Sequence, residues 1–481
     1  MILLMVAALL IQASPSPATQ DTTGRPCRVA VDSMGHYAEI PHRDGTKTLH
    51  GGGGVLAHCD GTNTTISADS FAHHGALGRL DLIGRVQIRD TGMALDARLA
   101  SYYLREERLE AHNNVVAVNR RNGSVLRGPN LRYLRAAKGI RDTVEMYATQ
   151  RPTVKYRQAA PGDTARGQPE PYIIVADRMR FKGDDRMWAG GKATIDRSDF
   201  AARSDSMMLD QTRGLGVLVR GKPIVEGKGR QAAGEAAKSY TLVGTRIELA
   251  LERRDVRAVK AMGDGKATGS DWTLTGDTID LHISNRMLQQ TFAWGDSLRP
   301  HAISTLYTIQ SDSMAIDSPD EVLTESRAFG KAFSTARRDS TATAAETDWI
   351  TGDTLTARFV QVQDRASNRP RTRLRQIVSH GSARALTHHP ENRDTTAAAG
   401  DSASAQPAIN YSRGQQIDIT LLADRIDRVI VAGKADGVHL EPRPAVVVDS
   451  LKRAGADTTR SVAPAPPAPP PPPARRPSGT P

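Results

Sequence analysis

Aromatic residues are scarce in this chain of 481 residues, where Phe, Trp and Tyr together occupy only 4% of the positions. So few large rings argue against the large compact core of an ordinary soluble enzyme. Beyond the N-terminus, no run approaches the roughly 20 apolar residues that a membrane helix needs. Glycine (41) and proline (27) are frequent instead, which predicts many turns. Together these features favour a glycine-punctuated chain rich in β-strands.

Cysteine is also rare, with Cys27 and Cys59 as the only two. They follow Met1–Ala13, an apolar segment of the length found in export signals, with small residues at Ala13 and Ala18 as candidate cleavage sites. The alternative for this segment is a buried N-terminal strand or short helix. An even cysteine count in an exported chain predicts a disulfide, which would close a loop of about 30 residues and contribute ~3 kcal/mol. Two lone cysteines do not make a metal site.

The chain is basic, with 64 Lys and Arg against 53 Asp and Glu and a net charge of +11. A basic surface attracts nucleic acid or anionic lipid headgroups. These charges are spread along the chain and mixed with acidic residues, without a basic arm or an aromatic platform. We therefore expect solvated strand faces, or attraction to a phosphorylated or anionic lipid, and no nucleic-acid partner.

Composition also suggests how the chain is divided. Proline dominates its last part, which predicts an extended, disordered polyproline II tail. The expected divisions are a signal peptide (1–18), an N-terminal segment with the disulfide (19–66), a β-jellyroll (67–156), a linker (157–171), further β repeats (172–386), a linker or insertion (387–413), a last β repeat (414–440) and the proline-rich tail (441–481).

A short pattern recurs about ten times: a small residue, Asp and alternating apolar residues, then a turn and a second apolar stretch ending in small-Gly-x-small. Ala176–Phe181 followed by Trp188–Ala193 is one copy. Apolar residues with period two, as in Ile279, Leu281 and Ile283, indicate half-buried strands. The glycine permits a bulge or tight bend. Because one such unit cannot bury its apolar face alone, the units must stack. The predicted fold is all-β, an elongated open β-jellyroll or β-solenoid built from about ten strand-turn-strand repeats.

Three phrases within residues 68–156 carry a resemblance to a known family: Leu80–Val86 (LDLIGRV), Leu95–Tyr102 and Leu109–Val115. They resemble the OstA-like family, which includes the LptA-type periplasmic lipopolysaccharide-transport proteins and the N-terminal domain of the outer-membrane lipopolysaccharide-assembly protein. Arg85 stands where the family usually has Asn, and Asn113 where it has Gly. Over residues 173–438 the likeness is weaker, with Gly-Lys-Ala often in place of Gly-Asn-Val. The chain is also far longer than a typical bridge protein.

The resemblance implies a groove that cradles the acyl chains of lipopolysaccharide while its sugars stay in water. Each sheltered methylene is worth about 0.8 kcal/mol, so exposing a chain of about a dozen carbons would cost on the order of 10 kcal/mol. No bond is made or broken, so no catalytic residue and no cofactor is expected. A packed core would show the same apolar pattern as a groove. The inward-facing aliphatic residues expected to line the groove are Leu80, Leu82, Val86, Ile88, Leu99, Leu109 and Val115.

The resemblance also implies a periplasmic location, with association to the outer membrane, and stacking with other proteins. Open jellyrolls present unpaired edge strands, which are templates for β-augmentation. The expected partners are lipopolysaccharide or a related lipid, other jellyroll components of the transport pathway and further copies of this chain.

One motif suggests an enzyme. Gly295-Asp296-Ser297-Leu298 spells the GDSL phrase of a hydrolase family, and Asp436 and His439 supply the acid and base that a nucleophilic serine needs. Both phrases fall in or beside the small-Gly-x-small positions of the repeat, and GDSL lies far from the N-terminal place it has in that family. We therefore do not expect a hydrolase.

Two histidine pairs, His73-His74 and His388-His389, are expected in loops without a spaced set of other ligands, so no metal site is predicted. Phosphate-loop and dinucleotide fingerprints are lacking from the sequence.

The sequence therefore favours a non-enzymatic carrier of lipopolysaccharide or a related lipid. The alternative is a structural or adhesive β-solenoid with a packed interior, and a third hypothesis is a scaffold for assembling outer-membrane proteins. An open interior of lipid size would distinguish the first two.

Overall fold

The computed structural model describes residues 27–157, 170–228, 239–252, 255–269, 272–304, 307–336, 347–363, 370–389, 408–422 and 425–441. The predicted signal peptide, residues 158–169 and 390–407 of the two predicted linkers, and the tail from residue 442 lie outside these ranges. Among the described residues, no helix is long and apolar enough to cross a membrane.

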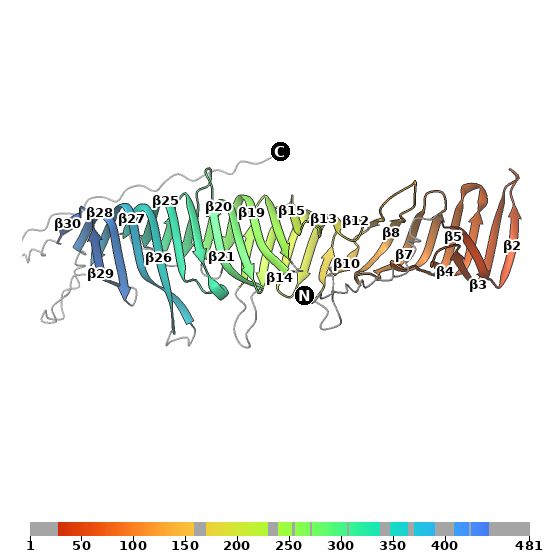
Figure 1. Ribbon diagram of the computed structural model, residues 1–481, viewed down its shortest axis with the longest axis horizontal. Coiled ribbons are helices and arrows are strands. Elements are labelled where there is room, and N and C mark those ends of the chain that lie inside the picture. The colour runs from red at the N-terminus through yellow and green to blue at the C-terminus, as the bar shows by residue number, and fades with distance from the viewer. Residues whose placement is uncertain are drawn as a thin grey trace, which may run out of the picture.

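The described chain forms one antiparallel sheet of thirty strands, stacked into an elongated body with β2 at one end and β30 at the other (Figure 1). The predicted class, an elongated all-β fold, is confirmed. The elements are β1 (Val29–Ser33), β2 (His36–Pro41), β3 (Lys47–Cys59), β4 (Thr65–His74), η2 (Gly75–Leu77), β5 (Arg79–Arg89), β6 (Met93–Tyr103), β7 (Arg108–Asn119), β8 (Val125–Leu134), β9 (Glu145–Thr149), β10 (Thr153–Tyr156), β11 (Tyr172–Val175), β12 (Arg178–Lys182), β13 (Arg186–Arg197), β14 (Phe200–Asp210), β15 (Leu215–Val219), β16 (Ile224–Lys228), β17 (Ser239–Val243), β18 (Arg246–Glu252), β19 (Asp255–Thr268), β20 (Trp272–Ser284), β21 (Met287–Trp294), β22 (His301–Ser304), β23 (Tyr307–Gln310), β24 (Ser313–Asp317), η3 (Pro319–Glu321), β25 (Glu325–Ala336), β26 (Trp349–Gln363), β27 (Pro370–His389), β28 (Ala408–Leu422), β29 (Arg425–Ala432) and β30 (Asp436–Leu440).

Long strands bend at their middle, and the glycine of the repeat makes the bend. In β5 the residues Gly84 and Arg85 have left-handed φ angles of +71° and +43°, and the pairing with β6 shifts there, from Ile83 opposite Leu99 to Val86 opposite Ala97. Glycine adopts such angles without steric cost. The bend was predicted, but it lies inside the second strand of each unit rather than at its end.

The bend recurs along the molecule. Paired left-handed residues occupy the same place in β3, β13, β25 and β27, and between β15 and β16 and between β29 and β30, where the strand is interrupted. In β7 the pair is Asn113 and Asn114, at +64° and +57°. Asparagine is one of the few other residues that visit this region routinely, so it replaces the glycine of the repeat without breaking the bend.

The spacing of Asp and Gly that recurs from repeat to repeat also has a structural reason. A Cβ built on Gly84 would lie 2.3 Å from Asp69 Oδ2 on the neighbouring strand, and one on Gly330 would lie 2.4 Å from Asp312 Oδ2. The same close approach joins Gly191 to Asp177. Each Asp therefore packs against the bend of the next strand, and a side chain at the glycine would collide with it.

Because the long strands bend at the same level, the sheet folds into two layers that face each other. Layer 1 contains the first half of β5 and the strands β2, β9, β12, β15, β18, β21, β24 and β29. Layer 2 contains the second half of β5 and the strands β1, β10, β11, β16, β17, β22, β23 and β30. Opposite the bends, the turns of the two layers face each other along a line that we call the mouth.

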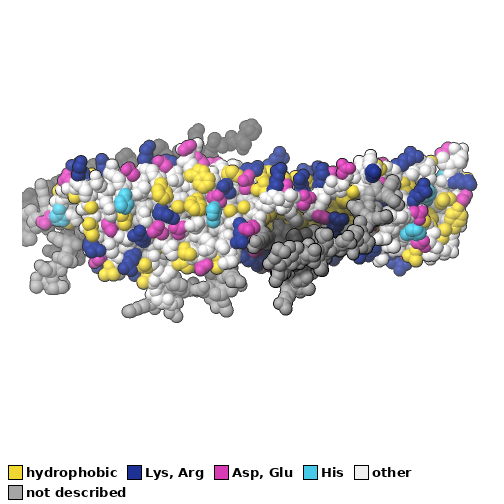
Figure 2. All heavy atoms as spheres, in the orientation of Figure 1, with side chains coloured by type: hydrophobic (Ala, Val, Ile, Leu, Met, Phe, Trp, Pro, Cys, Tyr) yellow, Lys and Arg dark blue, Asp and Glu magenta, His cyan; other side chains and the backbone are white. Residues whose placement is uncertain are grey.

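An apolar core fills the space between the layers along the body, and its fully buried side chains include Leu95, Ile174, Leu218, Leu242 and Ile417. Charged side chains of both signs are interspersed over the outer face seen in Figure 2. This arrangement places the apolar face of the repeats inside and most of their charges in water.

Three sequence predictions about boundaries and loops are wrong. The boundary between residues 66 and 67 falls inside β4, which pairs with β3 across it. The ends of the predicted linker 387–413 belong to β27 and β28. His73-His74 and His388-His389 lie in strands, not in loops. In each case the pairing with neighbouring strands continues the sheet through residues whose local sequence is polar or irregular.

Candidate functional site

Six of the seven aliphatic residues predicted to line a groove point between the two layers. Their exposed fractions run from 1% for Val86 and Val115 to 7% for Ile88. They pack within the apolar core together with the rings and small side chains of neighbouring strands. The remaining members of this buried set are Leu80, Leu82 and Leu109.

Leu99 is the exception, and the prediction for it is wrong. It points outward with 39% of its surface exposed, as does its cross-strand partner Ile83 at 45%. In β6 the buried series runs through Leu95 and Ala97 and continues at Ala100. The bend at Arg98 inserts one residue, and a shift of one residue moves all later side chains to the opposite face.

Described residues line two sizeable openings of the interior, and none of these seven residues lines either of them. The larger opening, which we call the C-terminal cavity, has a volume of about 360 Å³ and lies between β17 and β27. Aliphatic side chains and the rings of Trp272, Tyr307 and Phe359 line it, and Glu321, Gln361 and Arg371 supply polar groups. Its aliphatic walls include Leu274, Leu288, Ile309, Ile316 and Leu355.

A second opening, the N-terminal cavity, has a volume of about 350 Å³. Met93, Leu126, Tyr133 and Phe181 form part of its wall, and the charged Arg121, Arg135 and Asp184 stand among its lining residues. Burial is the main reason why the pKa of Tyr133 is raised above its usual value. Both volumes fall near the lower end of the roughly 300–1,000 Å³ of small-molecule sites. The sequence did not single out either cavity, because cavity walls and packed core show the same alternation.

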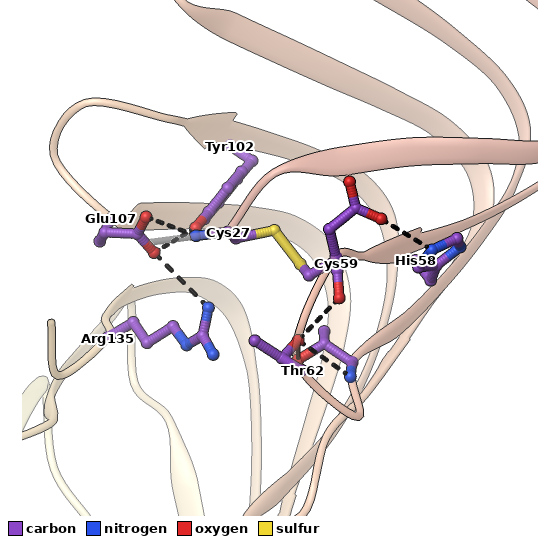
Figure 3. Close-up of a disulfide and its surroundings, with 9 residues drawn as sticks. Cys27, His58, Cys59, Thr62, Tyr102, Glu107 and Arg135 are labelled. Atoms are coloured by element: carbon purple, nitrogen blue, oxygen red, sulfur yellow. Dashed lines mark hydrogen bonds and ion pairs between the residues drawn. A yellow bond between two sulfur atoms is a disulfide. The ribbon is translucent and has the colours of Figure 1, made fainter. Parts of the chain in front are cut away.

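At the N-terminal end, a buried carboxylate joins the two sides of the mouth beside a disulfide (Figure 3). Cys27 and Cys59 are bonded, on the layer 2 side. The Cys27 backbone N–H donates to Glu107 Oε1 at 2.8 Å, and the Tyr102 hydroxyl donates to Glu107 Oε2 at 2.5 Å. Glu107 has no exposed surface and lies in the turn between β6 and β7, on the layer 1 side. Arg135 lies 3.7 Å from the same carboxylate.

Further polar contacts cross the mouth along the chain. Asn119 donates to Asp184 at 2.7 Å, Arg121 pairs with the same carboxylate at 3.1 Å, and Gln211 donates to the Tyr156 hydroxyl. In each contact one residue belongs to a layer 1 edge and the other to a layer 2 edge. The two layers are therefore fastened at several points beside and beyond the N-terminal cavity.

A further contact between the layers is a group of four charged residues that we call the ionic partition: Arg197, Asp199, Asp255 and Arg286. The side chains of Arg197 and Asp199 are 3% and 14% exposed. Arg197 Nε lies 2.5 Å from Asp199, and Arg286 Nε lies 3.4 Å from Asp199 and 3.5 Å from Asp255. Burial opposes the charge of Arg197, but its hydrogen bond to Asp199 and the nearby carboxylates outweigh burial and raise its pKa. The guanidinium stands 4.3 Å above the ring of Tyr172, whose pKa burial raises to about 12.

The GDSL phrase forms one of the bends. The backbone N–H groups of Ser297 and Leu298 donate to the carboxylate of Asp277 at 2.8 and 2.9 Å. His439 lies on β30, which pairs with β28, and the strands β23 to β28 lie between it and Ser297. Ser297, Asp436 and His439 therefore do not form a catalytic triad.

Each end of the sheet presents an edge strand. At one end β2 pairs with β3 and exposes Tyr37 and Ile40, and at the other β30 pairs with β28 and exposes Val438 and Leu440. Such edges carry backbone groups able to pair with another strand.

No protein-family model matches this chain, and no curated protein matches it. The resemblance to the OstA-like family therefore stays a prediction from the residues that carry it. Among solved structures, a match is the crystal structure of LptH, the LptA-homologous periplasmic component of the lipopolysaccharide transport device of Pseudomonas aeruginosa. It covers 28% of this chain and 94% of LptH, at 13% identity and a TM-score of 0.24.

Proposed function

We propose that this protein is a non-enzymatic periplasmic carrier that shelters the acyl chains of lipopolysaccharide, or of a related lipid, between its two layers. The observation that carries the proposal is the C-terminal cavity, an opening of about 360 Å³ in the apolar core. Burying each methylene of an acyl chain there is worth about 0.8 kcal/mol. No bond changes, so binding requires shape and apolar surface rather than catalytic groups.

The chemistry of the cavity fits an amphipathic ligand. Its deeper wall is aliphatic, for example at Leu274 and Leu288, whereas Arg371 supplies a cation among the lining residues. A guanidinium pairs well with phosphate or carboxylate groups. We therefore place the acyl chain between the layers and the anionic headgroup toward Arg371.

Stacking at the sheet ends is the second element of the proposal. The backbone of β2 at one end and of β30 at the other would pair with homologous strands of other jellyroll components or of a second copy of this chain. A continuous apolar path from one protein to the next would keep the acyl chains out of water.

Photo-crosslinking tests the proposal with a matched pair of phenylalanines. Phe359 lines the C-terminal cavity, whereas Phe333 points outward on β25 with 40% of its surface exposed. Benzoylphenylalanine, which extends the phenylalanine ring by a benzoyl group, replaces each in turn in the full chain made in lipopolysaccharide-producing cells. We expect lipopolysaccharide adducts at Phe359 and none at Phe333. Absence of adducts at Phe359, in folded and exported protein, would refute the carrier.

The alternative of a structural or adhesive solenoid is favoured by one observation. Leu82, Val86 and Val115 are packed in the core and line neither cavity. A molecule packed in this way throughout would carry no lipid. The absence of adducts at Phe359 would support this structural or adhesive role.

A further inference from the structure

We propose that the interior holds two separate acyl-chain sites, one in each cavity, and that the ionic partition keeps an acyl chain from passing between them. The inference rests on the proposed function. It adds a second binding site and a division of the interior, where a continuous apolar groove would form one site.

The two cavities are built from different parts of the chain. Residues 62–184 supply the wall of the N-terminal cavity, and residues 240–377 supply that of the C-terminal cavity. The two walls share no residue. Each is a site of similar volume with its own apolar surface and its own charged groups.

The ionic partition lies between them. A gap of only about 20 Å³ is lined by Arg197, Asp199 and Arg286 together with Tyr240 and Glu321, and the last two also line the C-terminal cavity. On the other side, Tyr172 beneath Arg197 pairs in register with Tyr156, which lines the N-terminal cavity. A chain moving along the mouth from one cavity to the other would have to pass this point.

The partition joins the two layers at the mouth, where its layer 1 members, Arg286 and Asp255, have side chains 40% and 44% exposed. Arg197 and Asp199 come from the turn between β13 and β14 on the layer 2 side, whereas Asp255 and Arg286 come from layer 1 turns. The Arg197 guanidinium, with its side chain only 3% exposed, lies 3.6 Å from Asp255 across this gap. The contacts therefore fasten the two layers together as well as filling the space between them.

A hydrocarbon cannot take the place of these groups. The gap has room for about one water molecule, which is too small for a methylene chain. Admitting an acyl chain would displace the Arg197 guanidinium, whose side chain is only 3% exposed, from the carboxylates around it. Leaving this buried charge without partners is strongly unfavourable. The partition therefore acts as a wall for apolar ligands, and each cavity fills and empties on its own.

The test counts ligands on the full chain by native mass spectrometry, with dodecanoic acid below its micellar concentration as the probe. Ala117→Phe narrows the N-terminal cavity, and Ala302→Phe narrows the C-terminal one. Ala201→Phe is the matched control, because Ala201 lies between the inward-facing Phe200 and Ala202 and points outward. Circular dichroism shows whether each variant keeps its strands.

We expect two bound molecules for the unmodified chain and for Ala201→Phe. We expect one for each single cavity variant, with the affinity of the remaining site changed less than twofold, and none for the double variant. A single bound molecule in the unmodified chain would overturn the inference of a second site but would leave the proposed carrier function standing. Loss of both molecules in either single variant would overturn the partition, and no binding at all would refute the carrier itself.

If Ala117→Phe or Ala302→Phe loses its strands, competition replaces it. Bromododecanoic acid quenches tryptophan on contact, and Trp272 lines the C-terminal cavity whereas no tryptophan lines the N-terminal one. Two sites predict that two molecules are bound when the quenching of Trp272 is complete. Binding that stops at one molecule when the quenching is complete would indicate one shared chamber and overturn the inference.

Discussion

The buried carboxylate of Glu107 is expected to hold the mouth closed at the N-terminal end, and Glu107→Ala tests this. The substitution leaves two buried donors without a partner, the Cys27 N–H and the Tyr102 hydroxyl, each costing about 1–3 kcal/mol. Arg135 also loses its carboxylate. Because Glu107 is fully buried, the total should approach the roughly 3–5 kcal/mol of a broken buried ion pair. Its φ angle of +48° brings no relief, since alanine is strained there as well.

The assay is hydrogen exchange followed by mass spectrometry, because neighbouring repeats open locally and a single unfolding midpoint would average over the chain. A loss of 3–5 kcal/mol makes exchange faster by about two to four powers of ten. We expect this in peptides from β1 and from the turn between β6 and β7, and no change in β26. The control is Glu106→Ala, whose exposed pair with Arg108 is worth about 1 kcal/mol at most. Exchange in Glu107→Ala within tenfold of that control would refute the reasoning.

Three further predictions concern the bends, the tyrosines and the disulfide. Gly330→Ala should destabilise β25 more than Gly45→Ala destabilises its turn. Both glycines have a positive φ, which costs alanine about 1–2 kcal/mol, but a Cβ at Gly330 would meet Asp312 at 2.4 Å whereas one at Gly45 would meet nothing within 4 Å. Equal local exchange rates in the two variants would contradict this prediction. Burial raises the pKa of Tyr156 and Tyr172 to about 12, whereas unfolded tyrosine titrates near pH 10. The unfolded state therefore loses its tyrosine protons first as the pH rises. The stability that these tyrosines contribute is complete below about pH 10 and falls by up to ~1.4 kcal/mol per pH unit for each tyrosine toward pH 12. A urea unfolding midpoint, measured by circular dichroism, that stays level from pH 8 to 11.5 would be the contrary result. Replacing both cysteines by serine removes a covalent link across 32 residues, which is worth about 3–4 kcal/mol. Hydrogen exchange should become faster in β1 and stay unchanged in β13. Faster exchange in β13 as well would show that the repeats unfold together.

Much of the fold follows from local sequence. Alternation of apolar residues with period two predicts the strands, and recurrence of the Asp and Gly pattern predicts that they stack as repeats. The structure adds the reason for that pattern, since Asp69 packs against the bend at Gly84. Asn113 could also be recognised as a substitute for the glycine, because it tolerates the same backbone angles.

The face of a residue beyond a bend was harder to predict. Leu99 belongs to the inward series of β6 if the alternation is continued without a break, but one inserted residue at the bend turns it outward. Strand ends were missed for a similar reason. Pairing with β28 extends β27 through His389, although the local sequence resembles a loop.

The sequence by itself determined that this protein is an elongated stack of β repeats with an apolar inner face, because period-two alternation and left-handed glycines are local properties of the chain. Only the tertiary structure decided where that interior is packed and where it is open. Leu82 fills a core whereas Leu288 faces a cavity, although both are apolar residues in alternating strands. The difference depends on how closely the two layers approach, and contacts between distant residues such as Arg197 and Asp255 set that distance.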